Sequence, residues 1–144
     1  MIQNDRRHAV WERRQTELWD RIFRVTQDVV TLAHSLRDLG GRQILRDELL
    51  RSAMAVGVHI VRANAAENAA VFEHHVREAR LQAVETDYWL RLVYVLQQSD
   101  EVQRDLSGII AQYASIIALL QQFLRHAQTE PHVLRHHAKG PLIN

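Results

Sequence analysis

Residues 49–63 read LLRSAMAVGVHIVRA and residues 69–93 read AAVFEHHVREARLQAVETDYWLRLV, and this stretch decides the fold. In both segments apolar and small side chains recur at intervals of three and four residues, which places them on one face of an α-helix. The segment NAAEN at 64–68 lies between them and is the plausible turn. The pattern therefore predicts two amphipathic helices, whose inner faces consist of Leu45, Leu49, Ser52, Val56, Ile60 and Ala63, and of Phe72, Val76, Ala79, Ala83, Thr86, Leu90 and Val93.

The same periodicity continues on both sides of this pair. Gly40 and Gly41 follow the first helical pattern, and glycine is common at helix C-caps. Asp100 with Gln103 resembles a capping box at the start of the last helix. The pattern stops near Gln128, so residues 128–144 are expected to form a flexible basic tail that contains histidines. The predicted helices span about 7–39, 43–63, 69–98 and 100–127.

The predicted fold class is all-α. Only two prolines and five glycines occur in 144 residues, which favours long helices over strands and their turns. Four helices with short links predict an antiparallel up-down-up-down four-helix bundle over residues 1–127. Gly57 lies in the middle of the second helix, where glycine costs about 1 kcal/mol relative to alanine. We therefore expect a neighbouring helix to approach closely there.

The fourth helix is more apolar than one bundle core requires. Ile109, Ile116 and Leu119 are candidates for a second seam that joins copies of the chain into a cyclic homo-oligomer. The alternative is that these three residues fill the core of their own bundle.

The sequence contains none of the common catalytic motifs that we searched for. It contains no cysteine, so disulfides and thiol chemistry are excluded. We find no glycine-rich phosphate loop, nucleophile elbow or paired catalytic carboxylates. We therefore expect a protein that is not an enzyme and has no cofactor. For Glu85, an ion pair between helices is favoured over catalysis.

The nine histidines invite a metal hypothesis. The bundle di-iron pattern needs Glu-x-x-His twice, and neither it nor His-Glu-x-x-His occurs. His74 and His75 are adjacent, so they point about 100° apart on a helix and cannot share one ion within a chain. His34 and His59 lie near apolar faces and are expected to be packing residues. The sequence therefore predicts no metal site.

The N-terminus has no apolar segment of a signal peptide, and the most apolar run, Ile109–Leu120, is shorter than the ~20 residues that span a bilayer. We therefore expect a cytoplasmic protein that does not enter membranes.

Positive charge is concentrated at the two ends of the sequence. Residues 1–14 contain four arginines and two acidic residues, and residues 125–144 contain three basic residues and one acidic residue. An even number of antiparallel helices brings both ends together, so the basic residues would form a rim suited to a polyanion. The alternative is a solvated end that keeps the protein soluble. The candidate nucleic-acid-binding residues are Arg6, Arg7, Arg13, Arg14, Arg62, Arg125, Arg135 and Lys139.

Residues 49–56, LLRSAMAV, and Phe72 with residues 78–90, EARLQAVETDYWL, resemble the second and third helices of the four helix bundle family known as 23S rRNA-intervening-sequence proteins. The resemblance covers about residues 10–127, and its specific part is 49–90. Ala79 and Glu85 fall on matching positions. Residues 59–63, HIVRA, replace the family's Asn-Ile-x-Glu-Gly signature and share only the isoleucine.

This resemblance implies a barrel-like homopentamer with a binding or assembly role rather than a reaction. A similar fold occurs in the accessory variability protein of diversity-generating retroelements, which binds a reverse transcriptase and nucleic acid. Our first hypothesis is accordingly a non-enzymatic oligomer that contacts RNA, DNA or a nucleic-acid enzyme such as a reverse transcriptase. The second is a protein–protein interaction module with no direct nucleic-acid contact.

Overall fold

A computed structural model of the chain describes residues 2–36 and 43–129. Within these two ranges it contains four α-helices and no strand, so the all-α, four-helix prediction is confirmed. The first helix starts and ends earlier than predicted, and the predicted cap at Gly40-Gly41 and the tail after Thr129 lie outside the described residues. The helices are α1 (Ile2–Ser35), α2 (Gln43–Asn64), α3 (Ala69–Leu96) and α4 (Asp100–Thr129).

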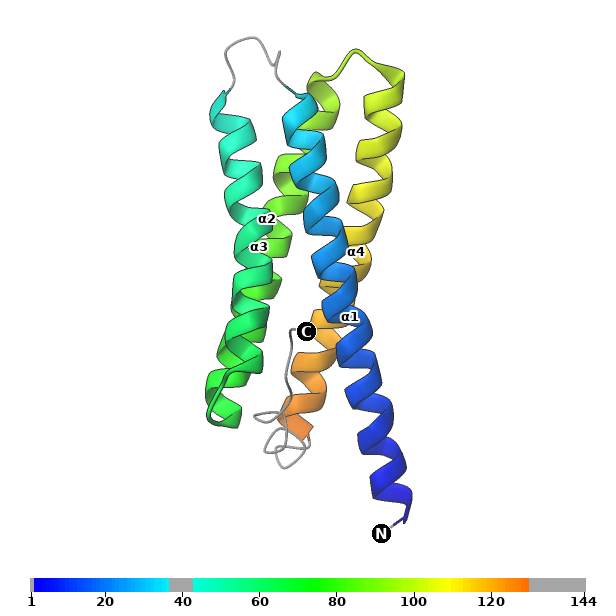
Figure 1. Cartoon of the computed structure of the whole chain (residues 1–144), viewed down its shortest axis with the longest axis vertical. Coiled ribbons are helices and arrows are strands. Elements are labelled where there is room, and N and C mark those ends of the chain that lie inside the picture. Colours follow the sequence, from blue (N-terminus) through cyan, green and yellow to red (C-terminus); the bar gives the residue numbers. More distant parts are fainter. Residues whose placement is uncertain (1, 37–42, 130–144) are drawn as a thin grey trace.

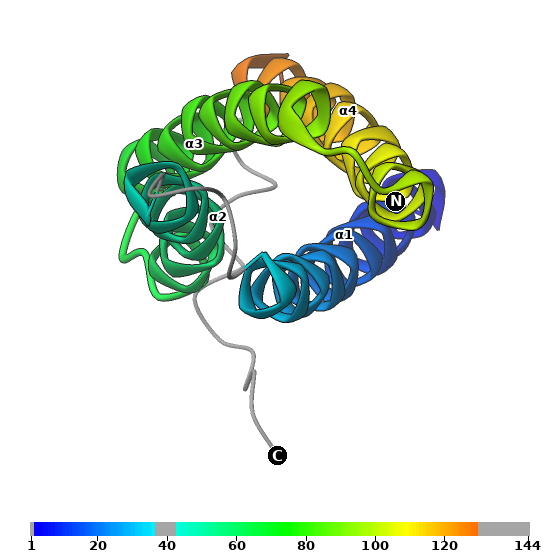
Figure 2. The same cartoon turned by 90° about the horizontal axis from the view of Figure 1, so that it is seen from above.

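The helices stand side by side, each in contact with two neighbours. Packing joins α1 to α2, α2 to α3, α3 to α4 and α4 back to α1. Figure 2, seen from above, shows this ring order. In Figure 1 the sequence colours show that the chain runs upwards through α1 and α3 and downwards through α2 and α4. The start of α1 and the end of α4 therefore lie at the same end of the molecule, and the first turns of α1 project beyond the other helices.

The predicted repeats form the core. The inner face of α3 is buried in full, and that of α2 is buried except for the half-buried Leu45. The other two helices contribute rows with the same spacing, because a stripe of three- and four-residue steps keeps to one side of a helix. These rows are Leu18, Ile22, Val25, Val29, Leu32 and Leu36 in the first helix, and Leu106, Ile109, Tyr113, Ile116, Leu120 and Phe123 in the last.

Two hydroxyl groups lie inside the α2–α3 contact. The Thr86 hydroxyl donates to the Ser52 hydroxyl oxygen at 3.0 Å, and the Ser52 hydroxyl lies 3.1 Å from the Leu49 carbonyl, to which it donates. Both side chains are fully buried, but each has a hydrogen-bond partner, so neither leaves an unpaired polar group in the core.

Side-chain caps explain links that contain no glycine or proline. The Asn68 side chain accepts a hydrogen bond from the Val71 amide at 3.0 Å and caps α3. At α4 the Ser99 hydroxyl accepts from the Val102 amide, so Ser99 is the cap and the capping box predicted for Asp100 with Gln103 is not formed. The Gln103 amide nitrogen instead donates to carbonyl oxygens at the end of α3.

The structure places the three residues of the predicted seam on α4 in or against the core of their own chain. Ile116 is completely buried and Ile109 is 7% exposed in the core of their own chain, and Leu119 is half-buried against that core. In this conformation Ile109 and Ile116 have no surface to offer to a second copy. No large hydrophobic side chain of the described α4 is exposed. By length and composition α4 could also cross a membrane, a property that core helices share.

Gly57 does not have the neighbour that was predicted. A Cβ atom built at this position meets no atom within 4 Å, so no helix of the described chain packs closely against it. The glycine faces open space instead.

Ala83 provides a test of the packing at the centre of α3. We expect Ala83→Leu to lower the free energy of unfolding by about 1–3 kcal/mol, because the added side chain has no room in a completely buried position. Ala111→Leu is the matched control, since Ala111 is exposed on α4 and should tolerate the same residue. Urea unfolding curves measure both, and equal stability of the two variants would contradict the packing described here.

Candidate functional site

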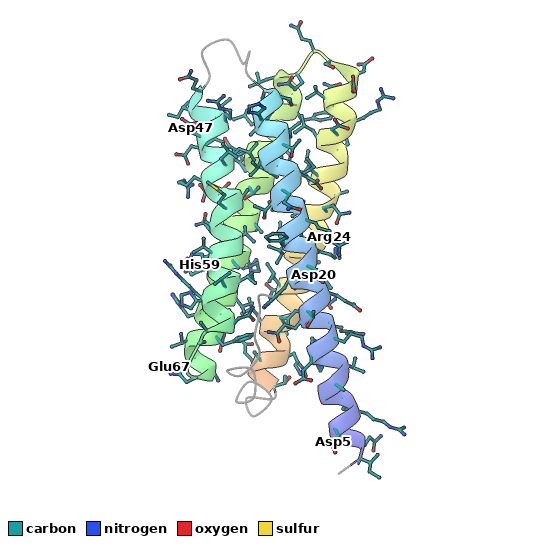
Figure 3. All side chains as sticks on the ribbon, viewed as in Figure 1. Asp5, Asp20, Arg24, Asp47, His59 and Glu67 are labelled. Atoms are coloured by element: carbon teal, nitrogen blue, oxygen red, sulfur yellow. The ribbon has the colours of Figure 1, made fainter. Side chains whose placement is uncertain are left out.

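Basic side chains gather at the end of the molecule where α1 begins. Arg6, Arg7, Arg13 and Arg14 are exposed along the first turns of α1, and Arg125 is exposed near the end of α4. Arg62 lies in the last turn of α2, close to the α2–α3 link. In Figure 3 the labels of Asp5 and Glu67 mark this same end on α1 and on that link. The structure therefore brings together six of the eight predicted residues, while Arg135 and Lys139 lie outside the described residues.

Some arginines outside this end, namely Arg21, Arg24, Arg80 and Arg104, also form no ion pair among the described side chains, whereas others are engaged. Four arginines elsewhere lie within 4.0 Å of a carboxylate, namely Arg46, Arg51, Arg77 and Arg91. Among the side chains that the structure describes, no ion pair includes an arginine of the basic end. Their guanidinium groups are consequently left with donors that can bind phosphate or carboxylate groups.

An aromatic cluster joins α1 to α4 near this end of the molecule. The Trp11 ring stacks on His126 with centroids 3.8 Å apart and meets the edge of Phe123 at 5.2 Å. The Arg14 guanidinium lies 5.6 Å from the centre of the Trp11 ring, in cation–π range. These contacts join the N-terminal part of α1, which carries Arg14, to the last turns of α4.

A polar cluster ties α1 to the end of α2 at the same level. Asn64 Oδ1 accepts hydrogen bonds from the Trp19 indole nitrogen at 2.5 Å and from Gln15 Nε2 at 3.2 Å. Because Asn64 is the last residue of α2, this contact fixes the helix turn that carries Arg62.

Glu85 forms the predicted ion pair between helices. Its carboxylate pairs with Arg51 of α2, which also contacts Glu48 at 2.9 Å. The Trp89 indole nitrogen donates to the same Glu85 oxygen at 3.4 Å. The hydrogen bond that Arg51 donates to Glu48 raises the pKa of Arg51 above its ordinary value, and Glu85 adds to this effect. The cluster links α2 to α3 on the outside of the bundle, where an exposed ion pair contributes little to stability.

Sequence reasoning missed the pairing of His59 with His75. The Nδ1 atoms of these two rings lie 3.2 Å apart across the α2–α3 contact. A signal was present, because the two residues are nearly equally distant from the 64–68 turn. Burial lowers the pKa of His59 below its ordinary value, and the nearby His75 lowers it further. Burial also lowers the pKa of His75, and Glu78 opposes both shifts.

These pKa shifts predict how stability depends on pH. Both histidines titrate lower in the folded chain than the value near 6.5 of an unfolded chain, so below about pH 6.5 the unfolded state binds more protons. Their contribution to stability is complete above that pH and is lost as the pH falls. When the pH is lowered from 7.5 to 5, we expect the free energy of unfolding to fall less in His75→Gln than in the unaltered protein. Urea unfolding curves at both pH values measure this difference. An identical loss in both would show that the pair is not responsible.

Comparison with solved structures supports the fold. A protein of unknown function from the S23 ribosomal protein family of Bacteroides thetaiotaomicron matches this chain with a TM-score of 0.67 and 23% sequence identity. The match covers 78% of this chain and 98% of the other. At this identity the similarity shows the shared four-helix fold alone. No curated protein matches the chain significantly in sequence.

Comparison with protein families confirms the resemblance found in the sequence. The profile of the 23S rRNA-intervening sequence proteins matches residues 14–122, a range that includes all of α2 and α3 and most of α1 and α4. The similar solved structure has the same helical fold. The chain therefore belongs to the 23S rRNA-intervening sequence protein family.

Proposed function

We propose that this chain is a non-enzymatic assembly protein that uses its basic end to contact RNA or DNA, directly or together with a nucleic-acid enzyme such as a reverse transcriptase. The observation that carries the proposal is the set of six arginines, from three helices, that face solvent at one end and form no ion pair among the described side chains. Guanidinium groups bind phosphate oxygens in pairs, and several together supply the sequence-independent part of nucleic-acid affinity.

The second part of the proposal is that copies of the chain associate into a cyclic homo-oligomer of antiparallel bundles, with a pentamer favoured. Its support is the exposed apolar surface of α2 and α3, on the faces opposite their buried stripes. This surface consists of Met54, Val58 and Val61 on α2, and of Leu81, Val84, Tyr88 and Val95 on α3.

Gly57 lies among the α2 residues of this surface and has open space before it. A mid-helix glycine next to Met54, Val58 and Val61 suits the close approach of another helix, and no helix of the described chain fills that place. We therefore assign the contact between copies to α2 and α3 instead of Ile109, Ile116 and Leu119.

Association would strengthen binding at the basic end. The first turns of α1 project past the other helices, so each copy in a ring adds its arginines to one rim (Figure 1). Several weak phosphate contacts on one assembly then act as linked sites with a high effective concentration. A modest charge excess per chain is sufficient in such an arrangement.

A second candidate function is a protein–protein interaction module without nucleic-acid contact. The exposed apolar residues of α2 and α3 favour it, because a partner protein could cover them in place of another copy. A pull-down that recovers one protein partner after nuclease treatment would favour this alternative.

Replacement of the α1 arginines tests the nucleic-acid contact. We expect the combined variant Arg6→Gln, Arg7→Gln, Arg13→Gln and Arg14→Gln to weaken binding of single-stranded and duplex RNA or DNA at about 50 mM salt. Each lost phosphate contact should also lower the slope of log affinity against log salt by about one. Fluorescence anisotropy at several salt concentrations measures both effects.

The control for this test removes the same charge elsewhere. A variant with glutamine at the four carboxylate-paired arginines Arg46, Arg51, Arg77 and Arg91 should keep most of the affinity, because those guanidinium groups are already engaged. Equal weakening in the two variants would show that only net charge matters. Absence of any binding by the unaltered protein would refute direct contact.

Charged substitutions test the surface between copies. We expect Met54→Glu with Val61→Glu to convert the oligomer to a smaller species in light scattering, because a contact that buries these residues would have to desolvate two carboxylates. Ala114→Glu with Ala118→Glu, at exposed positions of α4, is the matched control and should leave the mass unchanged. A monomeric unaltered protein, or dissociation by the α4 variant alone, would overturn the assignment.

A further inference from the structure

His59 and His75 form a contact that the proposed function does not use. His59 lies on α2, at a level between those of Asp47 and Glu67 in Figure 3. Its side chain is half-buried against α3. Its ring lies 5.5 Å from the His75 ring between centroids, with the Nδ1 atoms 3.2 Å apart. The rings therefore meet nitrogen to nitrogen, on two helices that the Ser52–Thr86 hydrogen bond and the surrounding core already hold together.

This separation suits a shared metal ion. Two nitrogen ligands bound tetrahedrally at roughly 2.0–2.1 Å lie about 3.3 Å from each other. The Nδ1 atoms therefore already have the spacing of a chelating pair. Only neutral imidazole binds a metal, and the lowered pKa values of both rings keep them neutral at pH 7.

The groups around the pair include Glu78, which favours a cation, and Arg62 and His74, which lower the pKa of both histidines. Glu78 follows His75 by one turn of α3, and its charge raises the pKa of both histidines, so it attracts a cation to this place. Arg62, one turn after His59 on α2, lowers both pKa values and repels a cation. The His74 ring meets His75 edge-on at 5.1 Å and lies on the outer side.

We propose that His59 and His75 are a two-histidine site for a divalent transition metal ion of the zinc, nickel and copper class. Imidazole nitrogen suits these ions. Among the described residues no three ligand-type side chains already stand at metal-binding positions, so water completes the coordination, with Glu78 as the nearest carboxylate that could turn towards it. The site would link α2 to α3 at the level just above the basic end.

Titration calorimetry with zinc chloride and with nickel chloride tests this site on the full chain. Because His132, His136 and His137 in the tail offer other imidazoles, all variants carry glutamine at those three positions. We expect one binding event that is weakened at least about tenfold by His59→Gln and equally by His75→Gln. His74→Gln is the matched control and should leave the affinity unchanged, while Arg62→Gln should strengthen it.

Thermal unfolding supplies a second measurement that does not depend on calorimetric heats. A metal that binds the folded pair raises Tm, and this increase should vanish in His59→Gln while circular dichroism shows that the variant remains helical. Binding that survives His59→Gln, binding lost through His74→Gln, or no binding at millimolar metal would each overturn the proposal and leave the pair as a hydrogen bond between imidazoles.

Discussion

The close contact between α2 and α3 is the constraint on which the rest of the structure depends. Ala53, Ala79 and Ala83 are completely buried, and Ser52 and Thr86 satisfy each other inside the same contact. Small side chains allow two helices to approach, and the buried hydroxyl groups fix how one helix is placed along the other. Every cross-helix feature of this pair follows from that placement, including the Arg51–Glu85 ion pair and the meeting of His59 with His75.

Around this pair the molecule separates its chemical properties by region. The side that faces α1 and α4 is the core, the outer faces of α2 and α3 carry exposed apolar side chains among charged ones, and six arginines without an ion pair among the described side chains lie at one end. Exposed apolar side chains in such number are unusual for a helix that contacts only water, so the outer faces are the natural place for association. The basic end requires no pocket, because phosphate recognition needs projecting donors rather than enclosure.

Much of the fold could be predicted from the sequence, because the spacing of apolar residues is a local property of a helix. The inner row of α3 is buried as predicted, and the helix ends differ from the predicted ones by a few residues. The candidate site was predicted less completely. Proximity of Arg62 to the α1 arginines followed from helix order. Arg77 and Arg91 follow Glu73 and Asp87 by four residues, a spacing that already indicates ion pairs on a helix, whereas only the tertiary structure identified Arg51 as the partner of Glu85.

The sequence by itself determined the helix number, the family and the concentration of charge at the chain ends, since each depends on residues close together in the chain. The tertiary structure alone decided which apolar residues remain exposed once the core has formed. Ile109 and Ile116 and the exposed Met54 and Val61 look equally apolar in the sequence, but only the former turn towards the core. It also decided that His75, and not the adjacent His74, meets His59, because the rotation of one helix against its neighbour depends on the packing of the whole core.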